Sequence, residues 1–391
     1  RIKKYNKDLN VIVTLTENLA IKQAKKADLE LNNGLYRGLL HGIPYGIKDL
    51  ASFPGYPTTW GAEPYKNQLI NEKAEVIQIL EESGAVMLGK LSSGALARGD
   101  VWFGGKTKNP WDLNQGSSGS SAGSASATAA GLVGFSIGTE TLGSIISPST
   151  RCGVSGLRPT YGSVSTNGFM TLSWSMDKIG PIARTAKGCA VVFNEIQKKE
   201  GLNKINKPFN KNTNNLKVAF LEDLFLNDTS RYAKNNTKTL ALIKKKTPVL
   251  YPTSLPKNFP FDVFDIILRA EAGAFFDEFL LKKKDETMVE QNEKSRANSL
   301  RQSRLIPAVE YIQANRFRTK LIEATNKIFN NYDIIISPSF GKNQLLITNL
   351  TGHPAISIPN GLDENNKPTS ITFIANYHQE DVLLSFVNLI Q

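Results

Sequence analysis

The chain has 391 residues, of which 40% are hydrophobic and 21% charged, as in an ordinary globular protein with a sizeable core. The net charge of +12 lies in short scattered runs such as 244–246 and 282–284, without interleaved aromatic residues, so a nucleic-acid-binding groove is not expected. The chain has two cysteines, Cys152 and Cys189, which are too few for a disulfide framework or a zinc site. The sequence leaves open whether these two form a single disulfide bond.

The N-terminus and the apolar runs bear on localisation. No run of eighteen or more apolar residues occurs, so the sequence predicts no membrane-spanning helix. Position 1 is an arginine, and the first residues resemble the middle of a helix. We therefore expect that the natural start is missing and that a signal peptide could have been lost with it. The sequence predicts a soluble protein and leaves open whether it is cytoplasmic, periplasmic or secreted.

Helical and extended patterns alternate along the chain. Apolar spacing and stop signals predict helices over residues 17–32, 74–83, 264–284, 316–329 and 382–390, and the body of a helix from Val191. Short β-branched or apolar runs predict strands within 39–51, 85–88, 135–137, 217–221, 333–337, 355–358 and 370–374, and residues 138–148 predict a loop. Such alternation indicates a layered α/β fold with a mainly buried sheet.

Residues 116–126 are almost wholly Gly, Ser and Ala and run into a segment that resembles a buried helix. A flexible linker is disfavoured because the apolar run 101–103 precedes the segment. A phosphate-binding loop is disfavoured because neither G-x-x-x-x-G-K-[ST] nor G-x-G-x-x-G occurs there. The remaining interpretation is a catalytic segment, in which small residues let backbone N–H groups and serine hydroxyls surround a reacting carbonyl.

Several separated motifs support the catalytic interpretation. They are residues 42–49 (GIPYGIKD), 116–125 (GSSGSSAGSA), 138–145 (GTETLGSI), 153–162 (GVSGLRPTYG), 177–184 (DKIGPIAR) and 349–355 (NLTGHPA). In this order they resemble the motifs of the amidase signature family. The resemblance implies a single large domain over residues 1–391, with a central mixed β-sheet covered by helices on both faces. We expect a signature core over about 40–190 and a helical excursion of lower stability over about 187–325.

The resemblance also implies a catalytic triad. The nucleophile is Ser144 of the Gly-Ser-Ile element, and the base is Lys48 of the Pro-x-Gly-x-Lys-Asp element. The bridging serine lies 24 residues before the nucleophile, at Ser120, and is preceded by a cis peptide bond. The oxyanion hole comprises the backbone N–H groups of Thr141, Leu142, Gly143 and Ser144.

These residue types suit the cleavage of an amide. A serine hydroxyl is a weak nucleophile until a base takes its proton. A lysine is such a base only when neutral, so its pKa must lie below the usual value of about 10.4. The predicted function is hydrolysis of a carboxamide C–N bond through a serine acyl-enzyme, with release of ammonia or an amine. The substrate is a small-molecule or peptide amide, no metal or organic cofactor is expected, and the protein is a monomer or homodimer.

Three positions depart from the usual family pattern, with Glu140, Leu142 and Ile146 where most members have Asp, Gly and Arg. The GTETLGSI form of residues 138–145 is closer to the peptide-amidase branch than to the A-type subunit of the tRNA amidotransferases. The departures leave the triad intact and put an inherited substrate specificity in doubt. Two alternatives remain: the catalytic A-type subunit of a tRNA-dependent amidotransferase, and an inactive amidase-like binding scaffold.

Other candidate site residues have structural alternatives. Trp60, Met170 and Trp174 are candidates for an acyl pocket, although packing in the core explains them equally well. Asp177 and Arg158 are expected to be structural partners rather than catalysts.

The three histidines are enough in number for a Ser-His-Asp triad, but such a triad is not expected because no G-x-S-x-G element occurs. They are His41, His353 and His378. His353 precedes Pro354 and is expected in a loop.

Overall fold

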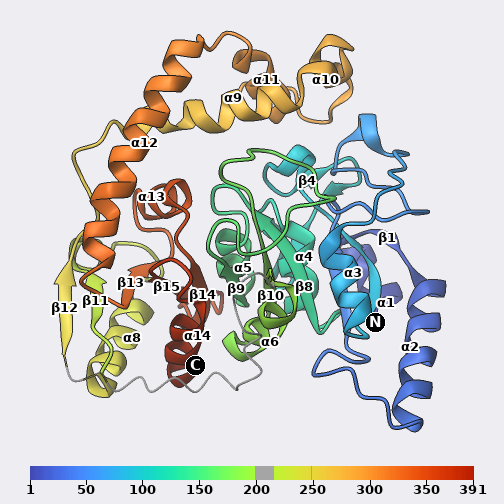
Figure 1. Cartoon of the computed structure of the whole chain (residues 1–391), viewed down its shortest axis with the longest axis horizontal. Coiled ribbons are helices and arrows are strands. Elements are labelled where there is room, and N and C mark those ends of the chain that lie inside the picture. Colours follow the sequence, from blue (N-terminus) through green and yellow to red (C-terminus); the bar gives the residue numbers. More distant parts are fainter. Residues whose placement is uncertain (199–214, 248) are drawn as a thin grey trace.

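A mixed β-sheet forms the centre of the computed structural model, which describes residues 1–198, 215–247 and 249–391 (Figure 1). Within these residues eleven strands make one sheet, in the order β1-β3-β2-β8-β10-β9-β14-β15-β13-β11-β12. β2 is parallel to β3 and β8, β11 is parallel to β12 and β13, and the other pairs are antiparallel. The strands are β1 (Ile12–Leu15), β2 (Pro44–Lys48), β3 (Val86–Leu91), β8 (Phe135–Glu140), β9 (Ser155–Arg158), β10 (Lys178–Ala183), β11 (Val218–Leu221), β12 (Leu250–Thr253), β13 (Ile334–Pro338), β14 (Ala355–Leu362) and β15 (Pro368–Ala375).

Helices cover both faces of this sheet. Side chains alternate between the two faces of a strand, and in β13 Ile334 and Ile336 pack into one core while Ile335 packs into the other. This confirms the predicted sheet with helices on both faces. The first core takes side chains from α3 (Glu75–Glu82), α6 (Ala186–Ile196), α8 (Ala233–Lys246) and α14 (Glu380–Ile390). The other face packs against α4 (Ala122–Ala129), α5 (Ile146–Cys152), α12 (Ala308–Phe329) and α13 (Gln344–Thr351).

Four helices form an arch that projects beyond the sheet (Figure 1). We call α9 (Asp265–Phe275), α10 (Asp277–Leu281), α11 (Arg296–Ser303) and α12 the helical arch. Its apolar side chains, Phe276 and Leu300 among them, pack against Leu50 and Met170 of the sheet domain. The arch therefore shares a hydrophobic core with the loops that follow β2 and precede β10.

The remaining elements flank the sheet. Helix α2 packs against β3, which lies next to the edge strand β1, and two short hairpins precede α4. These elements are α1 (Ile2–Leu9), α2 (Glu17–Asn32), α7 (Glu222–Leu226), β4 (Val101–Trp102), β5 (Gly105–Lys106), β6 (Lys108–Asn109) and β7 (Asp112–Gly116).

Most of the predicted elements are confirmed, and four need correction. The helix predicted over 316–329 begins eight residues earlier, since α12 starts at Ala308. The helix predicted over 264–284 is interrupted at Phe276, whose φ of −96° and ψ of 20° separate α9 from α10. Helix α6 begins at Ala186, because Thr185 caps it through the N–H of Gly188 at 3.1 Å. The loop predicted over 138–148 is shorter, since β8 continues to Glu140 and α5 begins at Ile146.

The Gly/Ser segment is part of the buried interior. Ser117, Ser120 and Ser121 are buried, and residues 122–128 form the buried body of α4. A side chain on Gly123 would meet the backbone N of Ser92 at 2.5 Å. Small residues are therefore needed for close packing here, and the linker interpretation is excluded.

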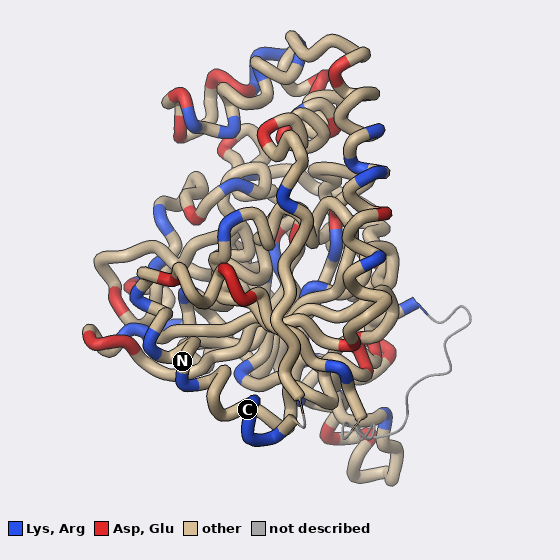
Figure 2. The backbone as a smooth tube through the Cα atoms, turned by 90° about the vertical axis from the view of Figure 1, so that its left-hand side faces the viewer, with Lys and Arg blue, Asp and Glu red and all other residues tan. Residues whose placement is uncertain are grey.

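Three further predictions concern the cysteines, the charge and the membrane. Cys152 and Cys189 are both buried and free, so the bridge that the sequence left open does not form. Lys and Arg are interspersed with Asp and Glu along the described backbone in the view of Figure 2. Among the described helices, none has the length and apolar character needed to cross a bilayer.

Candidate active site

Lys48 is the last residue of β2 and lies inside the sheet domain, with none of its surface exposed. β2 lies between β3 and β8, and this position encloses the side chain. Its Nζ donates to Ser120 Oγ at 2.7 Å, to Thr139 Oγ1 at 2.8 Å and to Ser121 Oγ at 3.1 Å. Lys48 is thus surrounded by hydroxyl groups rather than by a paired carboxylate.

This environment favours the neutral amine. Burial lowers the pKa of Lys48 to about 7, and the more distant carboxylates of Asp177 and Glu140 limit the shift. Removing a charge from water disfavours the charged form. A lysine with such a pKa is partly neutral near pH 7 and can accept a proton.

Ser120 directly precedes Ser121, the N-cap residue of α4, and follows a cis peptide bond from Gly119. Ser121 joins three segments: its Oγ donates to Thr139 O at 3.0 Å, and its N–H donates to Ser144 O at 3.2 Å. The loop that carries Ser144 is therefore connected directly to the Ser120–Ser121 segment. Ser121 and Thr139 were not predicted as site residues, although both lie inside the motifs around the triad.

Ser144 lies in a tight loop between β8 and α5 and is partly exposed. Gly143 has φ of +90°, a conformation that favours glycine. Within the described part of the chain, the backbone N–H groups of Leu142, Gly143 and Ser144 donate to no other residue. The N–H groups of Ile145 and Ile146, by contrast, donate to Glu140 Oε2 at 2.8 and 2.9 Å. The loop can therefore offer unused donors to a ligand.

The buried Glu140 carboxylate holds this loop through hydrogen bonds. Arg158 and Asn349 donate to Glu140 Oε1 at 3.0 and 2.8 Å, and both partners of the Glu140–Arg158 ion pair are fully buried. Burial alone would raise the pKa of Glu140, but the charge of Arg158 and the donated hydrogen bonds hold it below its usual range. Arg158 is thus a structural partner, and the longer Glu140 side chain satisfies two loop amides.

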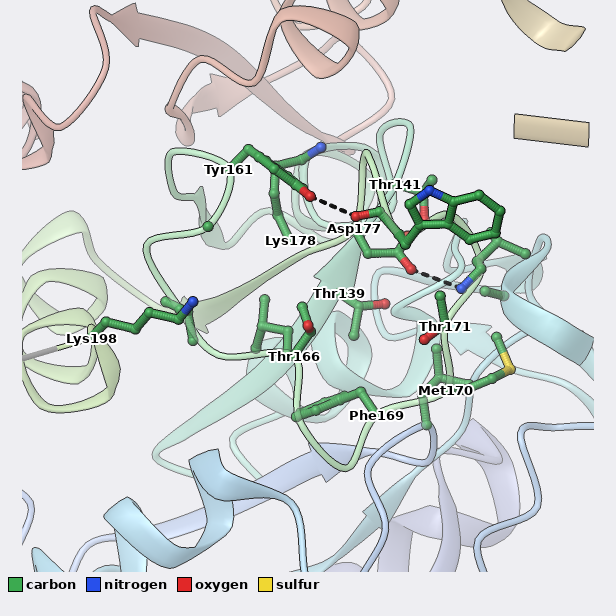
Figure 3. A pocket seen from close by; sticks show the side chains of 17 residues that line it. Thr139, Thr141, Tyr161, Thr166, Phe169, Met170, Thr171, Asp177, Lys178 and Lys198 are labelled. Atoms are coloured by element: carbon green, nitrogen blue, oxygen red, sulfur yellow. Dashed lines mark hydrogen bonds between the residues drawn. The ribbon is translucent and has the colours of Figure 1, made fainter. Parts of the chain in front are cut away.

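A cavity of about 310 Å³ lies beside Thr139 and Thr141 (Figure 3). Met170 and Trp174 line it, together with Phe169, Asp177 and other side chains. Thr139 connects this cavity to the hydroxyl groups around Lys48.

Trp60 and His353 have other surroundings. Trp60 does not line this cavity in the described part of the chain and packs against Tyr65 and Phe276 instead. His353 follows α13 in a loop and is stacked between Phe329 and Tyr377, with ring centroids 4.2 and 4.1 Å away. Burial lowers the pKa of His353 to about 3. Its contacts are those of a core residue.

Asp177 links the cavity wall to the loop. Thr141 Oγ1 donates to Asp177 Oδ1 at 2.6 Å, and the N–H groups of Leu172 and Ser173 donate to Oδ2 at 2.8 and 2.9 Å. Its carboxylate thus has structural partners. Within the described ranges, no three His, Cys, Asp or Glu side chains are grouped so that they could hold a metal ion.

A buried lysine with a low pKa beside serine hydroxyls is a kind of site that activates a serine for attack on a carbonyl carbon. The chain belongs to the amidase family, because residues 1–384 match the sequence profile described as Amidase. This match confirms the predicted family and enzyme class, an amidase acting on amide C–N bonds.

Individual relatives agree with this family. The A-type subunit of the glutamyl-tRNA(Gln) amidotransferase from Alkaliphilus metalliredigens is 29% identical over 98% of the chain and 89% of the relative. A peptide amidase structure from Stenotrophomonas maltophilia has a TM-score of 0.84 at 23% identity, covering 100% of this chain and 90% of that one. An inhibitor-bound vestigial protein complex, described as revealing the origins of an s-triazine catabolic enzyme, has a TM-score of 0.89 at 23% identity over 100% and 92%. The two structures show that the fold is shared.

Proposed function

We propose that this chain hydrolyses a carboxamide with Ser144 as nucleophile, Ser120 as bridging serine and Lys48 as base. The observation that carries the proposal is the contact of 2.7 Å between the buried Lys48 Nζ and Ser120 Oγ. A lysine whose pKa is about 7 can take a proton from a hydroxyl near neutral pH. The bond from Ser121 N–H to Ser144 O supports a location of Ser144 beside this pair.

The reaction has two stages. Neutral Lys48 takes the proton of Ser120, and Ser120 takes that of Ser144, whose Oγ attacks the carbonyl carbon. The oxyanion accepts hydrogen bonds from the unused N–H groups of Leu142, Gly143 and Ser144. The proton returns through Ser120 to the leaving nitrogen, the C–N bond breaks, and an acyl-enzyme remains. Water then attacks the ester by the same proton route and releases the acid.

The substrate is a small-molecule or peptide amide that the chain binds without nucleic acid, as a monomer or homodimer. A cavity of about 310 Å³ lies within the 300–1,000 Å³ that is typical of small-molecule sites. Its wall combines apolar side chains and hydroxyl groups with the charged residues Asp177, Lys178 and Lys198, and Trp174 is half exposed at the wall. Such a wall suits an acyl group that has an apolar part and a polar part.

Ser144→Ala tests the nucleophile. We expect it to abolish turnover of peptide, fatty and aryl amides and also covalent labelling by a fluorophosphonate, measured by mass spectrometry of the intact protein. Ser147→Ala is the matched control, since this serine lies three positions further on in α5 and should leave labelling unchanged. Labelling of another serine that persists in Ser144→Ala would contradict the assignment.

A second candidate is the catalytic A-type subunit of a tRNA-dependent amidotransferase. Relatives described as such subunits are 29% identical over nearly the whole chain. Ile146, where most family members have Arg, argues against this role. Turnover of a simple amide by the isolated chain supports a stand-alone amidase. Activity that requires added partner subunits supports the amidotransferase, and no activity with intact folding supports an inactive scaffold.

A further inference from the structure

The helical arch holds one segment of the cavity wall through a buried carboxylate. Glu271 on α9 has no exposed surface. Its Oε2 accepts from Ser173 Oγ at 2.5 Å and from Ser175 N–H at 3.2 Å, and its Oε1 accepts from Ser175 Oγ at 2.7 Å. Tyr311 of α12 donates to Oε1 at 3.0 Å. These bonds fix both serines that flank Trp174.

A second side chain of the arch binds the same segment. Arg318 on α12 donates from Nη1 to Ser175 Oγ and from Nη2 to Ser175 O, both at 2.7 Å. Its Nε donates to Leu350 O of α13 at 2.7 Å. Ser175 is therefore held by an anionic and a cationic partner from two different helices. A buried charge is stable only when hydrogen bonds satisfy it, and here the wall segment supplies most of them.

The wall segment continues to the loop of the proposed oxyanion hole. Leu172 and Ser173 donate to one oxygen of Asp177, and Thr141 donates to the other. Thr141 directly precedes Leu142 and Gly143, whose N–H groups are proposed oxyanion donors. A continuous series of hydrogen bonds thus runs from Glu271 through Ser173 and Asp177 to the loop.

We propose that Glu271 is a positioning residue for amide hydrolysis. Its hydrogen bonds hold the 172–177 segment in place and, through Asp177, align the loop that carries the proposed oxyanion donors. The inference rests on the proposed function. Electrostatic stabilisation of an oxyanion depends on donors fixed at 2.7–3.1 Å from it. A displacement of about 1 Å can lower a rate about 10²-fold. Glu271 does not touch the reacting atoms and acts through Ser173 and Asp177.

The test compares Glu271→Gln and Glu271→Ala with Asp265→Asn. Asp265 is the first residue of the same helix and pairs with Arg269 at the surface, so it is a matched carboxylate-to-amide control. We expect kcat to fall about 10-fold in Glu271→Gln and about 100-fold in Glu271→Ala, with much smaller changes in KM. Affinity for a boronic acid, which forms a tetrahedral adduct with the nucleophile, should fall by the same factors. The control should match the wild type.

A second substitution and a measurement without turnover keep the inference testable if Glu271→Ala folds poorly. Ser175→Ala removes the hydroxyl that contacts both Glu271 and Arg318, and should also lower kcat more than it changes KM. Hydrogen exchange of the Leu172 and Ser173 amides should be faster in the Glu271 variants and unchanged in Asp265→Asn. A folded Glu271→Ala protein with wild-type kcat, or with lower kcat and unchanged boronate affinity, would overturn the inference.

The two proposals fail in different ways. A wild-type chain that neither turns over an amide nor is labelled at Ser144 contradicts the proposed function. An active wild type whose Glu271 variants keep both kcat and slow amide exchange contradicts only the positioning role.

Discussion

Two lysines on neighbouring strands are both fully buried, yet their surroundings differ in charge. Lys90 on β3 is 2.7 Å from the Asp49 carboxylate and also donates to Thr58 Oγ1 at 2.6 Å. Lys48 on β2 has three hydroxyl partners. Burial lowers the pKa of Lys90, and the attraction of Asp49 opposes that shift. Burial likewise raises the pKa of Asp49, while Lys90 opposes that shift. The two lysines therefore differ in their partners, a carboxylate that favours the charged form of Lys90 and hydroxyl groups around Lys48.

Substitution of Lys48 should give the largest effect on activity. We expect Lys48→Ala to lower kcat by about 10²–10⁴-fold, since general base catalysis typically contributes that much. Lys48→Arg should not restore activity, because a guanidinium does not lose its proton in this pH range. Steady-state kinetics on one amide, with circular dichroism to verify folding, are the measurements. Near-normal activity of Lys48→Arg would mean that the charge, and not the neutral base, is what this position supplies.

Substitution at Lys90 should affect stability instead. Lys90→Met leaves the Asp49 carboxylate buried without its cation, and removing one partner of a buried pair typically costs about 3–5 kcal/mol. Lys48→Met breaks no such pair and should lower the free energy of unfolding by less. Urea unfolding of both variants checks the difference, and Lys90→Met/Asp49→Asn should recover part of the loss. Equal losses at the two positions would contradict the comparison.

The smallest expected effect concerns the pH profile. Only neutral Lys48 is active in the proposed mechanism, so kcat/KM of the wild type should fall as the pH drops through about 7. Thr139→Val removes a hydroxyl that accepts from the ammonium at 2.8 Å and therefore disfavours the charged form. The acid limb should move to lower pH by about one unit or less. A limb that moves to higher pH would show that Thr139 does not stabilise the ammonium.

Local pattern and motif order predict much of this molecule. Helix α2 has the predicted bounds. The motifs predicted that Lys48 and Ser120 act together, and Lys48 Nζ lies 2.7 Å from Ser120 Oγ. The break at Phe276 was not predictable, because the apolar spacing continues through it and the core of the arch decides where α9 ends.

The contacts of Glu271 and Arg318 could not be predicted either. Their partner Ser175 is 96 and 143 residues away in sequence, and neither charged residue lies in a motif. Contacts of this kind depend on how the arch packs on the domain. Sequence periodicity does not encode that packing in any local window.

The enclosure of Lys48 has a consequence for isotope effects. Its three hydroxyl partners are themselves buried, so a proton on Nζ has no direct contact with bulk water. In the proposed mechanism each proton reaches Lys48 by way of Ser120, and two hydrogens move in the step that forms the new C–O bond. In mixtures of light and heavy water, the rate then depends on the deuterium fraction along a curve rather than a straight line. Because Lys48 is buried, the shape of this curve reports that two hydrogens move in the same step.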